Sequence, residues 1–380
     1  MQQLLPRTYV DVTRDQRPGL FQAIEKRCEE IGPVEWPLTM SELSDLGAAA
    51  DIDAEINRQI DAVWAPLAAR AARDGVTRAD FVEHVAKRHP NYGRMQGVLE
   101  YEIAALTNFI AFGGRTFYWT AGLIERLAHT ELNVQAELVL PPFRSCLFVF
   151  DDDVSRGALQ ALNGRPGDPT PGPPINVFLS YLPCDAGGFT LALLIFNADD
   201  KSSAMMVKRQ LHLVDGQRVE DALRTDWAAV SADLAENPHG DDSRFYQEGL
   251  RFFRIVVNAI LYLSSSAPDV SAELRAHDLL PEPQPRMNSK ERKRLAYKAG
   301  KSSRLPYILV GGGVRAMVDG DVGRSDGVRR VTNHSRYLVS GHWRSQPHGP
   351  GRQQRKLVHI EPYFRGPEMA DLVARPYVVQ

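Results

Sequence analysis

The feature that most constrains the fold is an amphipathic stretch from Ser243 to Ser264. Its apolar residues recur at helical spacing and form one broad face, which consists of Phe245, Leu250, Phe253, Val256, Val257, Ile260 and Leu263. A helix with so wide an apolar face needs a complementary apolar surface to cover it. We therefore expect this helix to pack across a β-sheet built from other parts of the chain.

Short strand-like runs precede this helix. The β-leaning segments span residues 137–150, 175–181, 189–196 and 205–214, and turn-forming sequence separates them. Strands joined by short turns favour an antiparallel meander over the βαβ alternation of a doubly wound sheet. The sequence thus predicts an antiparallel sheet plus helices over residues 133–267.

The remainder of the chain divides by sequence pattern. Helical spacing dominates residues 14–130, including a helix capped by Thr77 and a renewed helical pattern over 116–132, so residues 1–132 are expected to be a helical region. A proline-containing polar linker is expected over 268–288, followed by a small basic β-rich C-terminal domain over 289–380. The predicted fold class is α+β, with strands expected at 305–310, 336–339 and 356–360.

Charge separates the C-terminal part from the rest. From Arg286 to the end there are 19 Lys and Arg against 7 Asp and Glu, or +12, which leaves 26 against 40, or −14, for the remainder. Such an asymmetry points to a polyanionic partner for the basic part. The alternative is that the two parts of the chain attract each other.

Several classes of site lack support in the sequence. The cysteines Cys28, Cys146 and Cys184 lie far apart without CxxC spacing, so neither a zinc site nor a disulfide framework is expected. The glycines at 311–313 are not followed by a Walker lysine and indicate a turn, and the aspartates at 151–153 indicate a solvated strand end. We expect no cofactor and no metal.

Without a signal peptide or an apolar run long enough for a bilayer, a cytoplasmic location is expected.

The richest cluster of chemically active side chains lies between residues 334 and 363. Arginine and lysine there would neutralise phosphates, Trp343 would stack on bases, and the histidines would orient RNA or act as acid and base. The residues expected to contact nucleic acid are His334, Arg336, His342, Trp343, Arg344, Arg352 and Lys356. The alternative is structural, with Trp343 in the core of a small β-domain and the histidines bonding its turns.

A pattern of fixed residue types runs through this region. It reads His-x-Arg, Gly-His-Trp-Arg, Gly-x-Gly-Arg, Lys and Ile-x-Pro-Tyr, after an amphipathic helix that ends in Leu-Tyr-Leu-Ser-Ser. The combination resembles the large type V-A anti-CRISPR proteins and their mobile-element relatives, mainly over residues 245–365. The resemblance implies a non-enzymatic inhibitor that recognises the type V effector nuclease, at its nascent N-terminal peptide, and lowers its mRNA and protein.

Three hypotheses follow from the sequence. In the first, a phage or mobile-element regulatory protein binds a CRISPR effector nuclease or its nascent peptide with its body and binds RNA, such as ribosomal or messenger RNA, with its tail. In the second, the tail is a metal-independent ribonuclease that uses His334 or His342 as the base and Arg344 to stabilise the phosphate. In the third, the tail is a structural domain docked on the acidic body. No membrane partner is expected in any of them.

Overall fold

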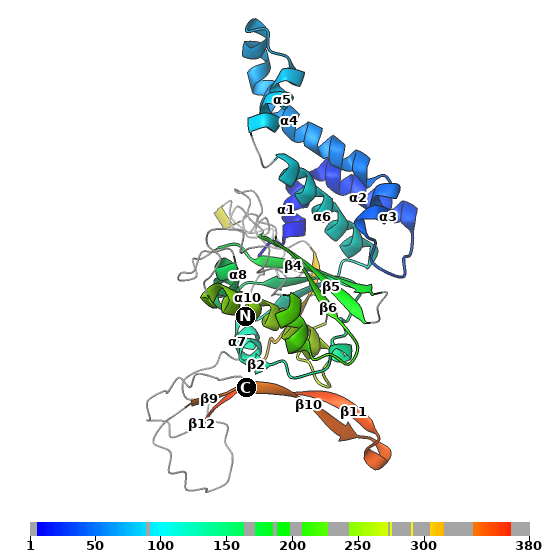
Figure 1. Cartoon of the computed structure of the whole chain (residues 1–380), viewed down its shortest axis with the longest axis vertical. Helices are drawn as coiled ribbons and strands as arrows, with labels where there is room; N and C mark the ends of the chain where they lie inside the picture. Colours follow the sequence, from blue (N-terminus) through cyan, green and yellow to red (C-terminus); the bar gives the residue numbers. More distant parts are fainter. Residues whose placement is uncertain are drawn as a thin grey trace.

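The structure is a computed structural model. It describes residues 6–88, 92–162, 172–184, 188–197, 207–226, 243–272, 274–275, 290–291, 305–314 and 337–365. Helices and strands build a two-sided body, from which a helical arm and a β-hairpin extend at opposite ends (Figure 1). The predicted α+β class is confirmed.

The first helices match the helical periodicity of the sequence. They are α1 (Tyr9–Gln16), α2 (Pro18–Ile31), α3 (Met40–Asp45), α4 (Ala48–Arg73), α5 (Arg78–Arg88) and α6 (Tyr92–Ala111). The predicted cap of α5 is confirmed, because the Thr77 hydroxyl accepts from the Asp80 amide while the Asp80 carboxylate accepts from the Thr77 amide. Asp11 and Glu42 close equivalent capping boxes at α1 and α3.

The helical prediction for residues 116–119 is wrong. These residues form strand β1 (Thr116–Trp119), which is followed by α7 (Ala121–Ala128) and the short strand β2 (Thr130–Glu131). All four residues of β1 are buried. A β-branched residue followed by three aromatic residues suits a strand with both faces covered, and this outweighs the helical spacing of the flanking apolar residues.

The main sheet has seven strands in the order β6-β5-β4-β3-β1-β8-β7. The strands not yet introduced are β3 (Ser145–Phe150), β4 (Ile175–Pro183), β5 (Phe189–Asn197), β6 (Val207–Leu213), β7 (Leu274–Arg275) and β8 (Pro306–Val310). From β3 to β6 the strands form the predicted antiparallel meander. However, β1 lies parallel to both β3 and β8, so the sheet also draws on the segments expected to be a helical region and a separate C-terminal domain.

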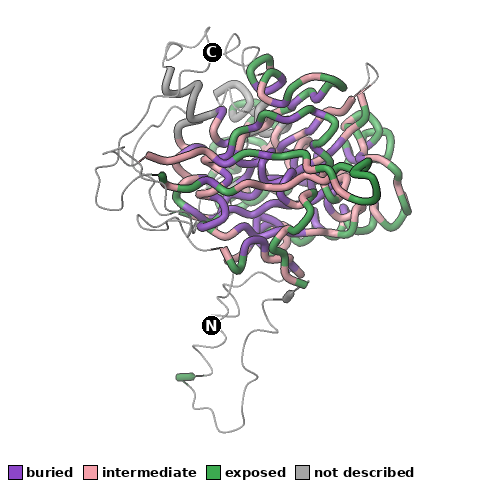
Figure 2. Tube along the Cα trace, turned by 90° about the horizontal axis from the view of Figure 1, so that it is seen from below, coloured by how far each residue is buried: buried purple, intermediate pink, exposed green. Residues whose placement is uncertain are grey.

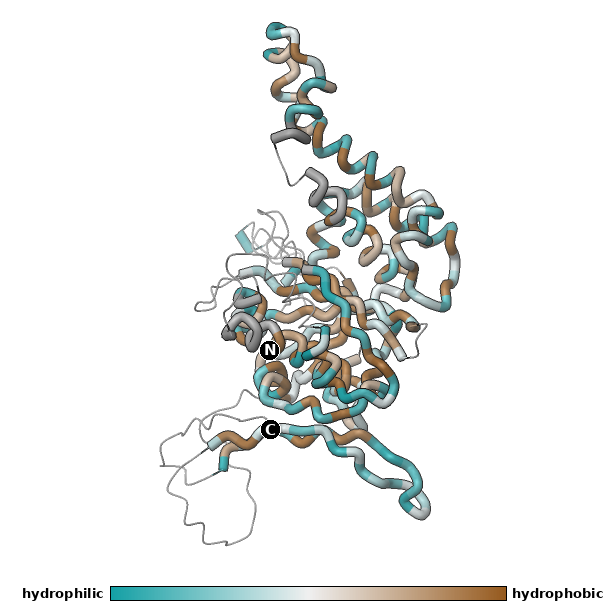
Figure 3. The backbone as a smooth tube through the Cα atoms, viewed as in Figure 1, coloured by the Kyte–Doolittle hydropathy of each residue, from teal (hydrophilic) through white to brown (hydrophobic). Residues whose placement is uncertain are grey.

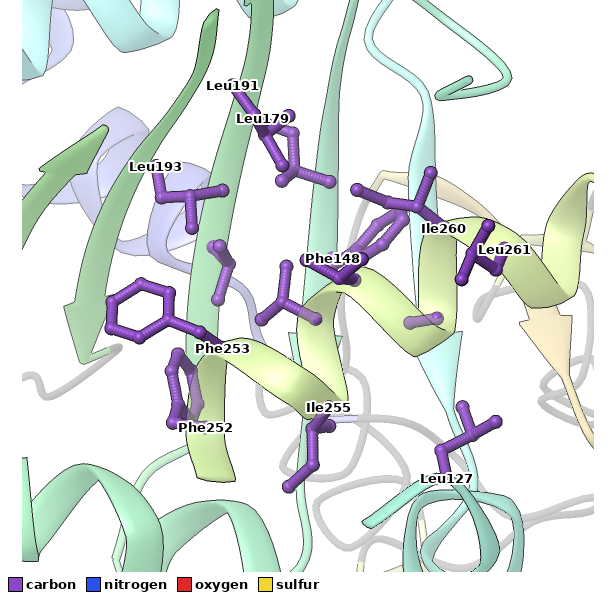
Figure 4. Close-up of a cluster of buried hydrophobic side chains, with 14 of the residues drawn as sticks. Leu127, Phe148, Leu179, Leu191, Leu193, Phe252, Phe253, Ile255, Ile260 and Leu261 are labelled. Carbon is purple, nitrogen blue, oxygen red and sulfur yellow. The ribbon is translucent and has the colours of Figure 1, made fainter. Parts of the chain in front are cut away.

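Helices cover both faces of this sheet. The long helix α10 (Ser243–Leu263) packs across one face together with α7 and α8 (Asp153–Leu162), while α1, α2 and α6 contribute to the core on the other face. Strand β3 shows the alternation, since Phe148 belongs to the α10 side and Val149 to the α6 side. Figure 4 shows Phe148, Leu179 and Leu193 of the sheet gathered beside α10. The predicted packing of this helix on the sheet is confirmed, and the buried residues concentrate in the centre of the body (Figure 2).

Smaller elements complete the described chain. A 3-10 turn, η1 (Ala136–Leu138), precedes β3, and residues 219–226 are helical. The predicted turn at 311–313 is present, because the Val314 amide donates to the Gly311 carbonyl. The predicted solvated strand end at 151–153 is wrong in part, because Asp152 is buried and its carboxylate accepts from the Ser155 amide at the start of α8.

Residues 337–365 of the tail form two antiparallel strand pairs. Strand β9 (Tyr337–Val339) pairs with β12 (Tyr363–Arg365), and β10 (Gly341–His348) pairs with β11 (Gln354–Ile360) through the turn η3 (Pro350–Arg352). We call residues 341–360 the β10–β11 hairpin. Its root is joined to the body by a parallel pairing of β10 with β2, and its outer end extends past the body (Figure 1).

Two other observations concern the described residues. None of their helices is both long and apolar enough to cross a membrane. The same residues contain no group of three or more His, Cys, Asp or Glu side chains arranged to hold a metal ion.

Candidate nucleic-acid interface

The register of the β10–β11 hairpin sorts its side chains onto two faces. Trp343 lies opposite His359 and Arg344 lies opposite Val358. Residues directly opposite each other in an antiparallel pair share a face, and neighbours along a strand point to opposite faces. One face therefore carries Trp343, Ser345, Leu357 and His359, and the other carries His342, Arg344, Gln346, Lys356, Val358 and Ile360.

The first of these faces rests on the body. The Trp343 side chain is 7% exposed and belongs to the core on the α10 side of the sheet. Its indole N–H donates to Asn258 Oδ1 at 2.8 Å. Further along, the Leu357 carbonyl accepts from the Ser266 amide at 3.0 Å. These contacts fix which face of the hairpin turns inward.

Asn258 is the residue that anchors the hairpin. It is fully buried on α10, and its Nδ2 donates to the carbonyls of Leu127 and Thr130, each at 2.9 Å. Its Oδ1 accepts from Trp343, so the amide satisfies groups from α7, β2 and β10 at once. A buried amide with its hydrogen bonds made in this way holds three elements in one arrangement.

His359 lies beside Trp343 on the same inward face. Its Nε2 is 3.0 Å from Thr130 Oγ1, and its ring centroid is 4.7 Å from that of Trp343. Burial, followed by the nearby charges of Arg126 and His342, lowers the pKa of His359 to about 4. The imidazole is thus neutral near pH 7 and packs as an uncharged group.

Gly341 allows β10 to approach β2. A Cβ at this position would lie 2.7 Å from Thr130 Oγ1 and 2.9 Å from the Ile360 carbonyl oxygen. The Gly341 amide donates to the His129 carbonyl at 2.9 Å. Within the Gly-His-Trp-Arg motif, Gly341 and Trp343 therefore face inward and attach the strand, while His342 and Arg344 face outward.

The exposed surface of the hairpin is cationic. Residues 341–360 contain four basic residues and no acidic residue. Arg344, Arg352 and Arg355 are exposed and Lys356 is half-buried. None of the four forms an ion pair with any side chain in the described part of the chain.

The body uses its arginines differently. Arg17 binds Glu102, Arg27 binds Asp51 and Arg254 binds Glu220. An ion pair links the tail to the body, and it runs from Arg126 of the body to Glu361 of the tail. Among the described residues, no carboxylate of the acidic body forms an ion pair with a cation of the hairpin.

The turn at the outer end places Arg352 at the tip. Gly349 and Gly351 have φ of 77° and 64°, and Arg352 itself has φ of 57°. Glycine adopts this left-handed region without steric cost, whereas arginine does so at some cost. The sharp turn therefore uses its two glycines to reverse the chain and leaves the Arg352 side chain exposed. Figure 3 shows the outer half of the hairpin as largely hydrophilic.

The predicted site residues meet different outcomes. His342, Arg344 and Lys356 come together on the outward face, and Arg352 lies at the tip. His334 and Arg336 lie outside the described residues. Trp343 is buried and its indole N–H is occupied, which fits the alternative prediction that it is a core residue.

Sequence reasoning missed three residues that matter here. Arg355 adds a fourth cation, on the face opposite to that of Lys356, and could have been included because it directly precedes that lysine. Asn258 and His359 anchor the hairpin, and no local signal in the sequence distinguishes them.

Comparison with known proteins decides the family. The model of the AcrVA2-like family, described as the anti-CRISPR type V subtype A2 family, matches residues 109–365. The chain belongs to this family. No curated protein and no solved structure matches the chain.

The AcrVA2-like match extends the predicted resemblance toward the N-terminus. It begins in α6 and covers the sheet, α10 and both strand pairs of the tail. The anchor at Asn258 and the outward cations both lie within it, whereas α1 to α5 lie before it. The family assignment predicted from residues 245–365 is thereby confirmed and supports an anti-CRISPR role.

Proposed function

We propose that this AcrVA2-like protein is a regulatory binding protein that lowers expression of a CRISPR effector nuclease. Its body binds the nuclease or its nascent N-terminal peptide, and the β10–β11 hairpin binds RNA. The observation that carries the RNA part is the outward face of the hairpin, where Arg344 and Lys356 have no acidic partner among the described residues. Family membership supports the anti-CRISPR part.

The chemistry of this face suits phosphate groups. Arginine and lysine that are not engaged within the protein can replace the counterions condensed on a nucleic acid, and this release drives binding. A guanidinium binds two phosphate oxygens in a fork, whereas an ammonium acts as a point charge. Since both side chains lie on one face of a projecting ribbon, they can contact the same RNA backbone.

The burial of Trp343 shapes the expected mode of binding. Because the Trp343 ring is packed against α10 and His359, the hairpin has no exposed Trp, Tyr or Phe ring for base stacking. Phosphate contacts position a protein without reading sequence. We therefore expect binding that depends steeply on salt and weakly on RNA sequence.

The RNA part is tested by fluorescence anisotropy with a labelled 20-nucleotide RNA over a range of salt concentrations. For R344Q/K356Q, the slope of log K against log salt should fall by about 1.4, because each phosphate contact contributes about 0.7. This corresponds to roughly 25-fold weaker binding at 0.1 M salt. The matched control is R70Q/R73Q, which removes the same charge from exposed positions of α4 and should leave the slope unchanged.

Two outcomes would contradict this part of the proposal. One is the absence of RNA binding at low salt, and the other is an equal loss of affinity in both double variants. Recovered RNA should also be run on a denaturing gel, because cleavage by the wild-type protein that H342A abolishes would instead support the ribonuclease alternative.

The expression part requires cells that make a type V effector nuclease. Synonymous recoding of the first codons changes the mRNA but keeps the nascent peptide, whereas substitutions in the peptide change both. We expect the protein to lower nuclease mRNA from the recoded gene and to fail on the gene with an altered peptide. Equal lowering from both genes would contradict recognition of the nascent peptide.

A further inference from the structure

Strand β6 forms one edge of the seven-stranded sheet, with β5 as its neighbour. An edge strand presents alternate backbone N–H and C=O groups away from the sheet. Two contacts establish which residues of β6 direct their backbone groups away from the sheet. The His212 amide donates to Asp226 Oδ2 at 2.6 Å, and the Lys208 carbonyl accepts from Arg209 Nη1 at 2.7 Å.

These two contacts agree on the alternation. His212 is four positions after Lys208, and an even offset along a strand means that both belong to the set whose backbone groups point outward. Gln210 lies midway between them and belongs to the same set. Within the described part of the chain, its outward N–H and C=O have no partner, while side chains of the protein occupy one group on either side.

Neither of the two charged side chains that precede Gln210 is hydrogen-bonded to the Gln210 backbone. Lys208 is turned onto α6, where its Nζ donates to the Tyr101 hydroxyl at 2.8 Å and lies 4.1 Å from the ring centroid. Arg209 is turned onto the backbone of the preceding residue. Gln210 itself is neutral and exposed.

Arg209 supplies a second, independent observation. Its Nε is buried without a hydrogen-bond partner, and no carboxylate of the described residues pairs with it. Burial lowers the pKa of its guanidinium. A half-buried arginine that lacks a counter-charge has an unmet preference for an anion. By contrast, Arg17 and Arg254 of the body each form an ion pair with a carboxylate of the chain.

We propose that the β6 edge receives an extended, acidic peptide segment of a partner protein as an added strand. Gln210 would exchange both backbone hydrogen bonds with it, in the manner of other peptides that extend a sheet. Lys208 and Arg209 point to opposite faces, so two consecutive acidic residues of the peptide would reach one cation each. Asp226 contacts His212 at the other end of the strand. Its negative charge would repel the acidic residues of the peptide, so these would lie at the Lys208 end.

This inference rests on the proposed function only for the source of the peptide, which would be the nascent nuclease chain. The RNA-binding face of the hairpin takes no part in it. The two proposals can therefore fail separately: loss of peptide binding leaves the salt-dependent RNA binding in place, and the reverse is also true.

The test uses the full chain and a fluorescein-labelled nonapeptide, Thr-Val-Thr-Glu-Glu-Val-Thr-Val-Thr, with a Lys-Lys version as the charge control. Binding is followed by anisotropy, and hydrogen exchange locates it. We expect the acidic peptide to bind with a Kd of about 10 to 100 μM and the Lys-Lys peptide at least about tenfold more weakly. Exchange of the segment 207–213 should slow when the acidic peptide binds.

Two substitutions of Gln210 distinguish the contribution of its backbone N–H to peptide binding from that of its side chain. Q210P removes the outward N–H and should weaken peptide binding about tenfold or more, since proline is tolerated on an edge strand when its nitrogen faces solvent. Q210A keeps the N–H and should bind within about twofold of wild type. R209Q, which retains a polar side chain, should weaken binding of the acidic peptide about fivefold and reduce its preference over the Lys-Lys peptide.

Several results would overturn the proposal. They are the absence of binding at 1 mM peptide, protection located away from residues 207–213, and equal affinity of Q210P and Q210A. If Q210P does not fold, a peptide N-methylated at alternate residues gives the same test from the other side, and its undiminished binding would count against an added strand. Protection of 207–213 that grows with protein concentration in the absence of peptide would assign the edge to a second copy of this chain instead.

Discussion

The body and the β10–β11 hairpin make opposite use of positive charge. In the body, Arg17 is held by Glu102 and Arg156 by Asp151 and Asp153, so each guanidinium contributes to the fold. In the hairpin, Arg344 and Lys356 have no acidic partner in the described part of the chain. The same residue types are therefore structural in one region and available for a ligand in the other. No acidic residue occurs within 341–360, so no ion pair with a carboxylate can form inside the hairpin itself.

The largest expected effect concerns the buried charge of the body. Glu102 is 1% exposed and accepts hydrogen bonds from Arg17 Nη1 at 2.8 Å and from the Tyr9 hydroxyl at 2.7 Å. E102A leaves a largely buried guanidinium unpaired, which should lower the free energy of unfolding by about 3–5 kcal/mol. Urea denaturation measures the change.

The control for this prediction is E29A, at an exposed position of α2. It should stay within about 0.5 kcal/mol of the wild type. A similarly small loss for E102A would mean that the buried ion pair does not stabilise the body. The arginines of the body would then differ little from those of the hairpin in their contribution to the fold.

The second prediction concerns the junction between the two regions. N258A removes the acceptor of the Trp343 indole and the donor to the carbonyls of Leu127 and Thr130. Leaving buried polar groups unpaired should cost about 3 kcal/mol. Urea denaturation measures this loss, and trypsin should cleave at Arg344 and Lys356 faster because the hairpin is no longer held in place.

N133A provides the comparison, because Asn133 is exposed and lies outside the junction. It should match the wild type in both assays. Unchanged cleavage of N258A would indicate that the hairpin is attached mainly by its pairing with β2.

The third prediction is a pH dependence located at His359. The folded-state pKa is about 4, below the unfolded value of 6.5, so the unfolded chain binds more protons between these values. Stability from this group is complete above about pH 6.5 and is lost as the pH falls toward 4. We expect a loss of at most about 2 kcal/mol between pH 8 and pH 5.

Urea denaturation at both pH values, in the wild type and in H359Q, isolates the contribution of this histidine. The difference in the free energy of unfolding between the wild type and H359Q should change by at most about 2 kcal/mol between pH 8 and pH 5. A difference that does not change with pH would show that His359 is not buried in neutral form against Trp343 and Thr130.

The smallest expected effect returns to the outward face. R344Q/K356Q should change the free energy of unfolding by less than about 0.5 kcal/mol, because neither side chain has an ion-pair partner among the described residues. Urea denaturation with R70Q/R73Q alongside measures this change. A destabilisation comparable with that of E102A would show that the hairpin cations are structural after all, and would remove the contrast on which the RNA proposal depends.

Much of the fold was predictable from local patterns. The helix expected at 243–264 and the strands expected from 175 to 214 are present within a few residues of their predicted ends. Strand β1 was missed because its partners are remote in sequence, since β1 ends at Trp119 whereas β3 begins at Ser145 and β8 begins at Pro306. A local helical pattern carries no information about such distant parallel partners.

The candidate site was predicted as a set of residues but not as a surface. Arg344 and Lys356 were expected to contact nucleic acid, and the structure brings both onto one face of the hairpin. Trp343 was expected to stack on bases, yet it lies in the core. An aromatic residue beside basic residues has the same appearance in sequence whether its ring packs inward or faces a ligand, so only the partner at Asn258 distinguishes the two.

The sequence by itself determined the charge of the tail, the absence of acidic residues from 341–360, and the motif that carries the family resemblance. The tertiary structure decided which way that charge faces. In a strand the side chains alternate, so fixing one residue fixes all the others. The hydrogen bond from Trp343 to Asn258 fixes that one residue, and it turns Arg344 away from the acidic body.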